Sequence, residues 1–247
     1  LAGVRNVEFR QGSMFEPVAG ESFGLIVSNP PFVITPRGAD VPEYEYRDGG
    51  LVGDALVEAF LREAPEHLAP GGSAQLLGNW ESIGPSADSG AGVPGLRRLE
   101  SWIDRRLDAW VVQRETLSPL GYAELWIRDG GTTPRDAGFE PLLDAWLDDF
   151  ACRGVTEVGF GYVLLRRPAE KDVGTVVDPG SGTVMDPGSV RDPGTMPLRR
   201  FETLTQPVTS AGRAFRDGLA GHDALTDGIP DTLLVAPDVT EARHHIP

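Results

Sequence analysis

Four residues whose types could take part in catalysis follow a short apolar run in the first part of the chain. The run covers 23–28 (FGLIVS), and Asn29, Pro30, Pro31 and Phe32 come directly after it. Each proline fixes its own φ angle and biases the residue before it toward extended geometry, so this segment is stiff. The Asn29 amide and the Pro30 carbonyl offer hydrogen-bond acceptors, and Phe32 offers a ring for stacking. The segment is therefore suited to hold a flat NH2 group.

A planar amino or amide nitrogen is a poor nucleophile, because its lone pair is delocalised into the adjacent ring or carbonyl. Two acceptors that hold both hydrogens favour a pyramidal nitrogen and direct its lone pair toward an electrophile. This stabilises the transition state without a charged base. A stiff turn without a catalytic role is the alternative interpretation. The order of strand, Asn-Pro-Pro and aromatic residue favours a catalytic site.

The pattern of strands and helices expected around this segment predicts an α/β layered domain. Short apolar runs alternate with helix-like periods over residues 1–168. Expected strands cover 7–10, 23–28, 74–77, 109–113 and 158–165; expected helices begin after Asp54 and Pro94 and cover 139–150. Pro65 predicts a kink or a restart in the first helix, and Gly159 and Gly161 predict close packing or a bulge in the last strand. Because ligands collect beyond the carboxyl ends of parallel strands, Asn29 lies where a site is expected.

The composition changes after Pro168. Asp-Pro-Gly occurs three times, beginning at positions 178, 186 and 192, and each copy favours a turn. The copies lack apolar residues, so 169–197 is predicted to be a flexible linker, with a calcium-binding repeat as the less favoured alternative. Residues 198–247 predict a small, partial C-terminal accessory domain with a helix around 211–219. The adjacent histidines at 244 and 245 are expected to lie in an exposed tail, so no metal site is predicted.

The overall composition excludes several classes of protein. The 247 residues include 37 acidic and 22 basic side chains, a net charge of −15, which argues against a generic basic nucleic-acid coat. No run approaches the ~18 apolar residues of a membrane span and no export signal is seen, so a cytoplasmic protein without membrane contact is expected. Cys152 is the only cysteine, which excludes an internal disulfide and a multi-cysteine zinc site.

Two stretches resemble a known enzyme family. Residues 26–32 (IVSNPPF) are similar to the signature of class I S-adenosylmethionine-dependent N-methyltransferases that modify exocyclic amino groups of nucleobases or the side-chain amide of glutamine. Residues 7–17 (VEFRQGSMFEP) resemble the third strand and adenine-contacting loop of that family. The resemblance covers about residues 1–168. It implies a Rossmann-like methyltransferase sheet and S-adenosyl-L-methionine as the cofactor, with Ser13 and Met14 beside its adenine.

The resemblance also implies roles at the acceptor side. Asn29 and Pro30 would hold the target amine, Pro31 would belong to the same catalytic segment, and Phe32 would stack on the substrate. Residues 47–50 (RDGG) resemble a substrate-side loop of these enzymes, which would make Arg47 and Asp48 substrate contacts. Asp48 followed by glycine is equally a turn signal, and both interpretations stay open.

The chain departs from the family pattern in three places. Ser13 stands where the family usually has an acidic residue, and Gly24 stands where it usually has aspartate. A Gly-rich loop after a first strand and an acidic ribose-binding residue are not found in the sequence. We therefore expect an N-terminally truncated chain that begins near the family's third strand and exposes 23–28 as an apolar edge. Such a piece is expected to be inactive, and the complete parent protein to be active.

Three hypotheses on function follow. The first is methylation of a nucleobase in rRNA, tRNA or DNA, with RNA preferred, because an aromatic residue after Asn-Pro-Pro suits an unstacked base. The second is methylation of a glutamine N5 atom on a translation factor, which the charge of −15 favours. The third is a non-catalytic binding module on a methyltransferase scaffold. The oligomeric state cannot be deduced from the sequence.

Overall fold

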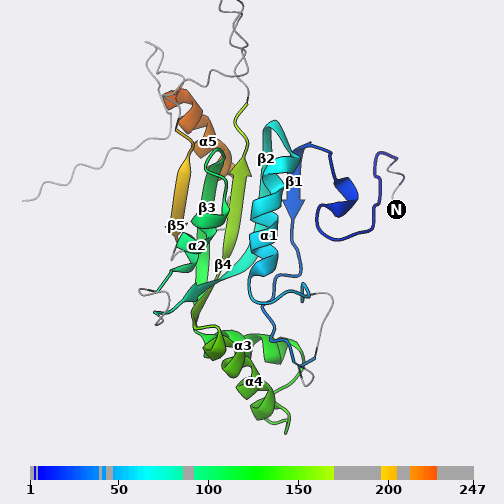
Figure 1. Ribbon diagram of the computed structural model, residues 1–247, viewed down its shortest axis with the longest axis vertical. Helices are drawn as coiled ribbons and strands as arrows, with labels where there is room; N and C mark the ends of the chain where they lie inside the picture. Colours follow the sequence, from blue (N-terminus) through cyan, green and yellow to red (C-terminus); the bar gives the residue numbers. More distant parts are fainter. Residues whose placement is uncertain are drawn as a thin grey trace, which may run out of the picture.

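One mixed sheet organises the protein (Figure 1). The computed structural model describes residues 3, 5–38, 41–42, 47–85, 92–169, 196–204 and 212–226. The strands are β1 (Phe23–Ser28), β2 (Leu68–Ile83), β3 (Asp108–Leu117), β4 (Val155–Arg166) and β5 (Arg199–Thr203), in the sheet order β1-β2-β4-β3-β5. The α-helices are α1 (Ala55–Glu63), α2 (Gly95–Trp102), α3 (Pro119–Asp129), α4 (Phe139–Cys152) and α5 (Gly212–Thr226), with short 3-10 helices at Glu16–Val18 and Ala64–His67. The predicted α/β class is confirmed.

The strand directions bring the carboxyl ends of several strands to the same end of the sheet. β1 pairs with β2 in parallel through the crossover helix α1, and β4 runs antiparallel between β2 and β3. β1, β2 and β3 therefore all point the same way. The segment after β1 and the helices α3 and α4, which follow β3, consequently lie at the same end of the sheet, below it in Figure 1.

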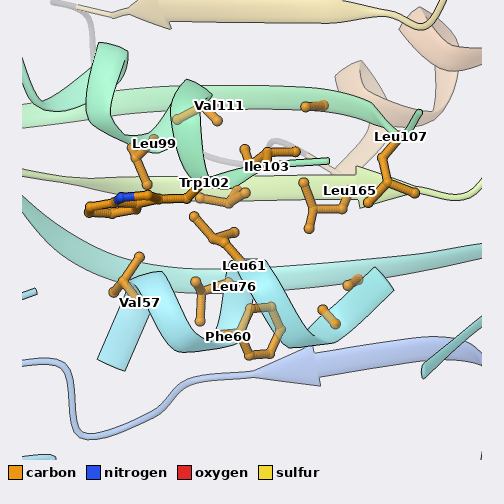
Figure 2. Packing of buried hydrophobic residues seen from close by; sticks show 14 of the residues in the cluster. Val57, Phe60, Leu61, Leu76, Leu99, Trp102, Ile103, Leu107, Val111 and Leu165 are labelled. Carbon is orange, nitrogen blue, oxygen red and sulfur yellow. The ribbon is translucent and has the colours of Figure 1, made fainter. Parts of the chain in front are cut away.

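Helices α1 and α2 cover one face of the sheet (Figure 2). The fully buried side chains of this layer include Leu61, Leu99, Val111 and Leu165, and also Trp80 and Leu68. Each contributes roughly 1.5–3 kcal/mol through removal of apolar surface from water. This layer is the main core, and it supports the strands whose carboxyl ends lie near Asn29.

Helix α5 covers the opposite face at β3 and β4. Trp110 and Val112 point to this side, whereas Val111 between them points to the main core, as the two-residue period of a strand requires. The ring of Phe215 meets Trp110 edge-on, with centroids 4.9 Å apart.

Among the helices of the described residues, none is long and apolar enough to cross a lipid bilayer.

The described residues of the C-terminal part add to the same sheet. Residues 198–247 are predicted to be a partial accessory domain; within them, β5 pairs in parallel with β3 and α5 packs on the sheet. So short a segment buries little apolar surface alone, and docking on an existing sheet supplies that surface. The predicted linker lies mostly outside the described residues, as do 227–247.

A third apolar cluster joins α3 and α4 to the segment after β1. Trp146 and Phe150 of α4 are buried against Tyr122 of α3, and Val33 and Ile34 belong to the same cluster. The chain just beyond Phe32 is therefore part of a core rather than a free loop.

Several predicted elements are confirmed and one is not. The strand 23–28 and the helix 139–150 are present, and α1 ends before Pro65, where the chain restarts as a 3-10 helix. No strand covers 7–10, where Val7 and Phe9 are 55% and 78% exposed. The prediction of that strand is wrong because a strand requires a partner for its backbone groups, and none of the described strands pairs with this stretch.

The two glycines of β4 confirm the prediction of close packing. A Cβ atom at Gly159 would overlap the indole of Trp80, and one at Gly161 would overlap the carbonyl of Val112. The register between β3 and β4 also shifts at this point.

The strand β1 forms an edge of the sheet. In the part of the chain that the structure describes, it pairs with β2 alone. Ile26 packs on the main core, whereas Leu25 and Val27 on the other face are 58% and 69% exposed. An apolar edge at 23–28 is the arrangement expected from the sequence.

Candidate active site

The four predicted catalytic residues leave the carboxyl end of β1. Asn29 is exposed, and Pro30, Pro31 and Phe32 are half-buried. The Asn29 amide is thus open to a ligand, while the residues after it are progressively held by the fold.

The position of Phe32 is set by two neighbours. Its ring lies against that of Phe160 in β4, with centroids 5.6 Å apart and planes at 40°. Its backbone forms an antiparallel bridge with Asp48, and the next amide, of Val33, donates to the carbonyl of Arg47 at 2.8 Å. One side of the ring is therefore in contact with protein, and the segment pairs with residues 47–48 as a short ribbon.

A small hollow lies beside this ribbon. It has a volume of about 10 Å³, room for about one water molecule, and is lined by Pro31, Phe32, Val33, Gly49, Leu51, Gly53, Asp54, Leu56 and Val57. Gly49 is needed here because a Cβ atom would stand 2.9 Å from the Pro31 carbonyl and overlap Leu56. The hollow is smaller than the roughly 300–1,000 Å³ of usual small-molecule pockets.

Arg47 and Asp48 are buried and engaged with protein. Asp48 binds Arg37 through both carboxylate oxygens and accepts from the Gly50 amide at 3.0 Å. Arg47 donates to the Trp126 carbonyl at 2.8 Å and to Asp129 at 2.9 Å. These contacts support the turn interpretation of Asp48, and the substrate role of both residues stays a prediction.

Ser13 and Met14 lie in an exposed turn before the first 3-10 helix. Met14 has a left-handed φ of 47°, and the Ser13 carbonyl accepts from the Glu16 amide at 2.9 Å. The following Phe15 stacks on His67 just before β2, with centroids 4.6 Å apart. This contact anchors the turn toward the amino ends of β1 and β2, so the structure does not bring Ser13 and Met14 together with Asn29.

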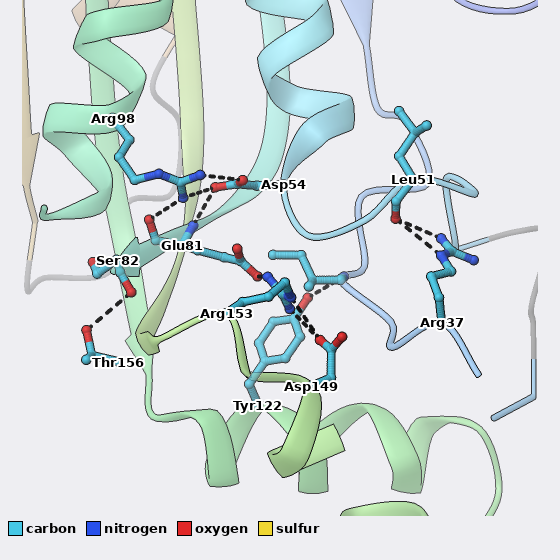
Figure 3. Close-up of polar contacts among 11 residues, drawn as sticks. Arg37, Leu51, Asp54, Glu81, Ser82, Arg98, Tyr122, Asp149, Arg153 and Thr156 are labelled. Carbon is cyan, nitrogen blue, oxygen red and sulfur yellow. Dashed lines mark hydrogen bonds and ion pairs between the residues drawn. The ribbon is translucent and has the colours of Figure 1, made fainter. Parts of the chain in front are cut away.

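A buried network of charges lies behind the hollow (Figure 3). Asp54 binds Arg98 through both oxygens, at 2.5 and 2.9 Å, and accepts from the Glu81 amide at 2.8 Å. Glu81 in turn pairs with Arg153. Burial raises the pKa of Glu81, with a further upward contribution from Asp54, while Arg153 opposes the shift. The network ties α1, β2 and α2 to the end of α4.

Asp54 differs from its expected role. It precedes α1 as predicted, but its side chain makes no capping hydrogen bond. The carboxylate turns instead to Arg98, because a buried charge requires an opposite charge more strongly than a helix end requires a cap. Across the described ranges, no group of three His, Cys, Asp or Glu side chains is arranged to hold a metal ion.

Helix α3 was not predicted, and it brings further residues to the site. The signal was present, since Ser118 accepts from the Gly121 amide at 3.2 Å and Pro119 stands at the first helical position. The helix places Tyr122 within hydrogen-bond distance of the backbone that follows Phe32. Sequence reasoning could have found the helix, but not this contact.

Comparison with known proteins finds similarity over part of the chain. No family model matches. The release factor glutamine methyltransferase of Geobacter sulfurreducens is 44% identical over 69 residues, which are 25% of this chain and 24% of that protein. The ribosomal protein uL3 glutamine methyltransferase of Bradyrhizobium diazoefficiens is 36% identical over 73 residues, 27% of this chain and 23% of that protein. The release factor glutamine methyltransferase of Xylella fastidiosa is 34% identical over 85 residues, 32% of this chain and 31% of that protein.

Among solved structures, coclaurine N-methyltransferase bound to N-methylheliamine and SAH matches 63% of this chain and 50% of its own, with 15% identity and a TM-score of 0.25. The chain spans from 23% to 31% of the length of the three curated relatives. Over that stretch, it is similar to methyltransferases that are named for a glutamine in a protein of the translation apparatus.

Proposed function

We propose that these residues belong to an S-adenosylmethionine-dependent methyltransferase that methylates the side-chain amide nitrogen of a glutamine in a translation protein. The observation that carries the proposal is the exposed Asn29 amide at the carboxyl end of β1, in a chain that is similar over part of its length to glutamine methyltransferases. The two prolines and the fixed ring of Phe32 follow it directly.

The cofactor supplies an electrophilic methyl group on a sulfonium when bound. Ser13 and Met14 are exposed but lie toward the amino ends of β1 and β2, away from Asn29, so the proposal assigns them no contact with the cofactor.

Each residue of the segment has a distinct task at the acceptor. The Asn29 amide oxygen and the Pro30 carbonyl accept the two hydrogens of the glutamine NH2, which favours a pyramidal nitrogen with its lone pair free to bond the methyl carbon. Pro31 keeps the two acceptors at a fixed separation. Phe32 orients the amide plane, so that positioning supplies most of the rate enhancement. The nitrogen then loses one proton to solvent.

The site favours a glutamine over a nucleobase. Phe160 already occupies one side of Phe32, which leaves less of that ring to stack on a flipped base. The charge of −15 and the exposed acidic stripe of Glu140, Asp144 and Asp148 on α4 repel a phosphate backbone. The names of the relatives agree with a protein substrate. We therefore place the glutamine hypothesis ahead of the nucleobase hypothesis.

The test compares cells with and without the gene. Peptides of release factors and ribosomal protein uL3 are measured by mass spectrometry, together with nucleosides from rRNA and tRNA. The proposal expects one glutamine peptide to lose the mass of a methyl group on deletion, with methylated nucleosides unchanged. Loss of a methylated nucleoside with all glutamine peptides unchanged would overturn it.

A further inference from the structure

One tyrosine hydroxyl joins three separate parts of the chain beside the candidate site. Tyr122 of α3 is 2% exposed, and its hydroxyl accepts from the backbone amide of Ile34 at 3.0 Å and from Nδ2 of Asn79 at 2.5 Å. Asn79 lies in β2 and is itself 2% exposed. Ile34 stands two residues beyond Phe32, so this oxygen holds the chain just after the Asn-Pro-Pro-Phe segment.

The same helix holds the other side of the ribbon. The Trp126 carbonyl and the Asp129 carboxylate of α3 both accept from Arg47, whose own carbonyl accepts from the Val33 amide. The segment after β1 therefore has two anchors on α3, and Tyr122 is the one that acts directly on its backbone.

The Tyr122 hydroxyl suits a fixed anchor. Burial raises the pKa of this phenol, so the hydroxyl stays neutral across the physiological range. The ring is wedged among Trp126, Trp146 and Phe150, at centroid distances of 6.0 to 6.2 Å. Its orientation is set by packing, and the oxygen is consequently presented to Ile34 at a fixed place.

We propose that Tyr122 is a positioning residue for methyl transfer, which holds Ile34 and thereby sets where Phe32 and Asn29 stand relative to the acceptor amide. This inference rests on the proposed function. Rates of group transfer are sensitive to such placement, since a displacement of about 1 Å can cost roughly 100-fold. Tyr122 touches no reacting atom and acts only through the backbone.

The test removes the hydroxyl and keeps the ring, in the gene product that carries these residues. In Tyr122→Phe, deuterium exchange at the Ile34 amide is expected to become about tenfold faster, because the amide loses its acceptor. The kcat of glutamine methylation is expected to fall about tenfold or more, with the KM for cofactor unchanged. Tyr162→Phe is the matched control, since it loses a hydroxyl that accepts from Arg114 and should change neither quantity.

The outcomes separate this inference from the proposed function. Unchanged exchange at Ile34 in Tyr122→Phe overturns the positioning role, whether or not glutamine is the substrate. Faster exchange with an unchanged kcat also overturns it. Faster exchange in a protein that methylates a nucleobase instead of glutamine supports the anchor and contradicts only the substrate. Should Tyr122→Phe not fold, Asn79→Ala keeps the hydroxyl, and a rise in Ile34 exchange of about threefold is expected; no rise would overturn the role.

Discussion

The ring of Phe32, in the segment after β1, lies against the ring of Phe160 in β4, with their centroids 5.6 Å apart. The two residues are 128 positions apart in the chain by number, and β2 separates their strands in the sheet. The sheet therefore supports the aromatic ring of the Asn-Pro-Pro-Phe segment from one side. In the proposed function, a substrate approaches the part of that ring that remains open.

The first prediction concerns the energy of this ring contact. Phe32→Leu and Phe160→Leu should show a coupling energy of about 0.5–1.5 kcal/mol in the free energy of unfolding, as expected for an aromatic pair. Urea denaturation of both single variants and of the double variant measures it. Phe32→Leu combined with Phe215→Leu is the control, since Phe215 packs on Trp110 instead and the two changes should be additive. Additivity between Phe32 and Phe160 would contradict the contact.

The second prediction concerns the buried ion pair behind the hollow. Asp54 is 5% exposed, and Asp54→Ala leaves the Arg98 guanidinium without its main partner. A loss of about 3–5 kcal/mol in unfolding free energy is expected. Glu58→Ala in the same helix region breaks the exposed pair with Arg62 and should cost no more than about 0.5 kcal/mol. Equal losses of unfolding free energy in the two variants would show that the buried Asp54–Arg98 pair stabilises the fold no more than an exposed pair does.

The third prediction concerns pH. Since burial raises the pKa of Glu81 above 4.5, the folded protein keeps a proton on Glu81 in a pH window where the unfolded chain has already lost it. This contribution to stability is present at low pH and is lost as the pH rises through the raised pKa. The difference in unfolding free energy between wild type and Glu81→Gln should therefore shift in favour of the wild type as the pH falls from about 8 toward about 4.5. A difference that is constant with pH would contradict the raised pKa.

Local patterns made much of the fold predictable. The apolar run at 23–28 and the stripe at 139–150 are encoded by neighbouring residues, so β1 and α4 are found near their predicted positions. The strand expected at 7–10 failed, because strand formation depends on a partner that the sequence pattern does not reveal. The start of helix α3 could be predicted from Ser118, but the sequence does not indicate which segment the aromatic residues of this helix contact.

The fourth prediction tests the docking of α5 on the sheet. A Cβ atom at Gly218 would overlap the Trp110 ring, so Gly218→Ala should weaken this docking even though alanine favours a helix. Gly221→Ala meets no atom within 4 Å and should stabilise the helix by up to about 1 kcal/mol. Thermal unfolding, followed by tryptophan fluorescence, compares the two variants. A stabilising Gly218→Ala would show that α5 does not lie on Trp110.

The candidate site was predictable only in part for the same physical reason. Asn29 could be placed at the carboxyl end of a strand because a proline pair after an apolar run is a local signal. The partners of Arg47 and Asp54 could not, since Asp129 and Arg98 lie 82 and 44 residues away along the chain. Ion pairs between segments that are distant in the chain depend on the fold and produce no periodic pattern in the sequence.

The measurement that tests the central claim most directly is methyl transfer to a glutamine peptide by Asn29→Ala, in the gene product that carries these residues. Activity should fall by about 100-fold or more, since one of the two acceptors of the NH2 group is lost, while unfolding free energy stays within about 0.5 kcal/mol because Asn29 is exposed. Asn6→Ala removes an equally exposed asparagine and should leave both quantities unchanged. If Asn29→Ala keeps its activity within about twofold of the wild type, the acceptor role of the Asn-Pro-Pro-Phe segment is contradicted.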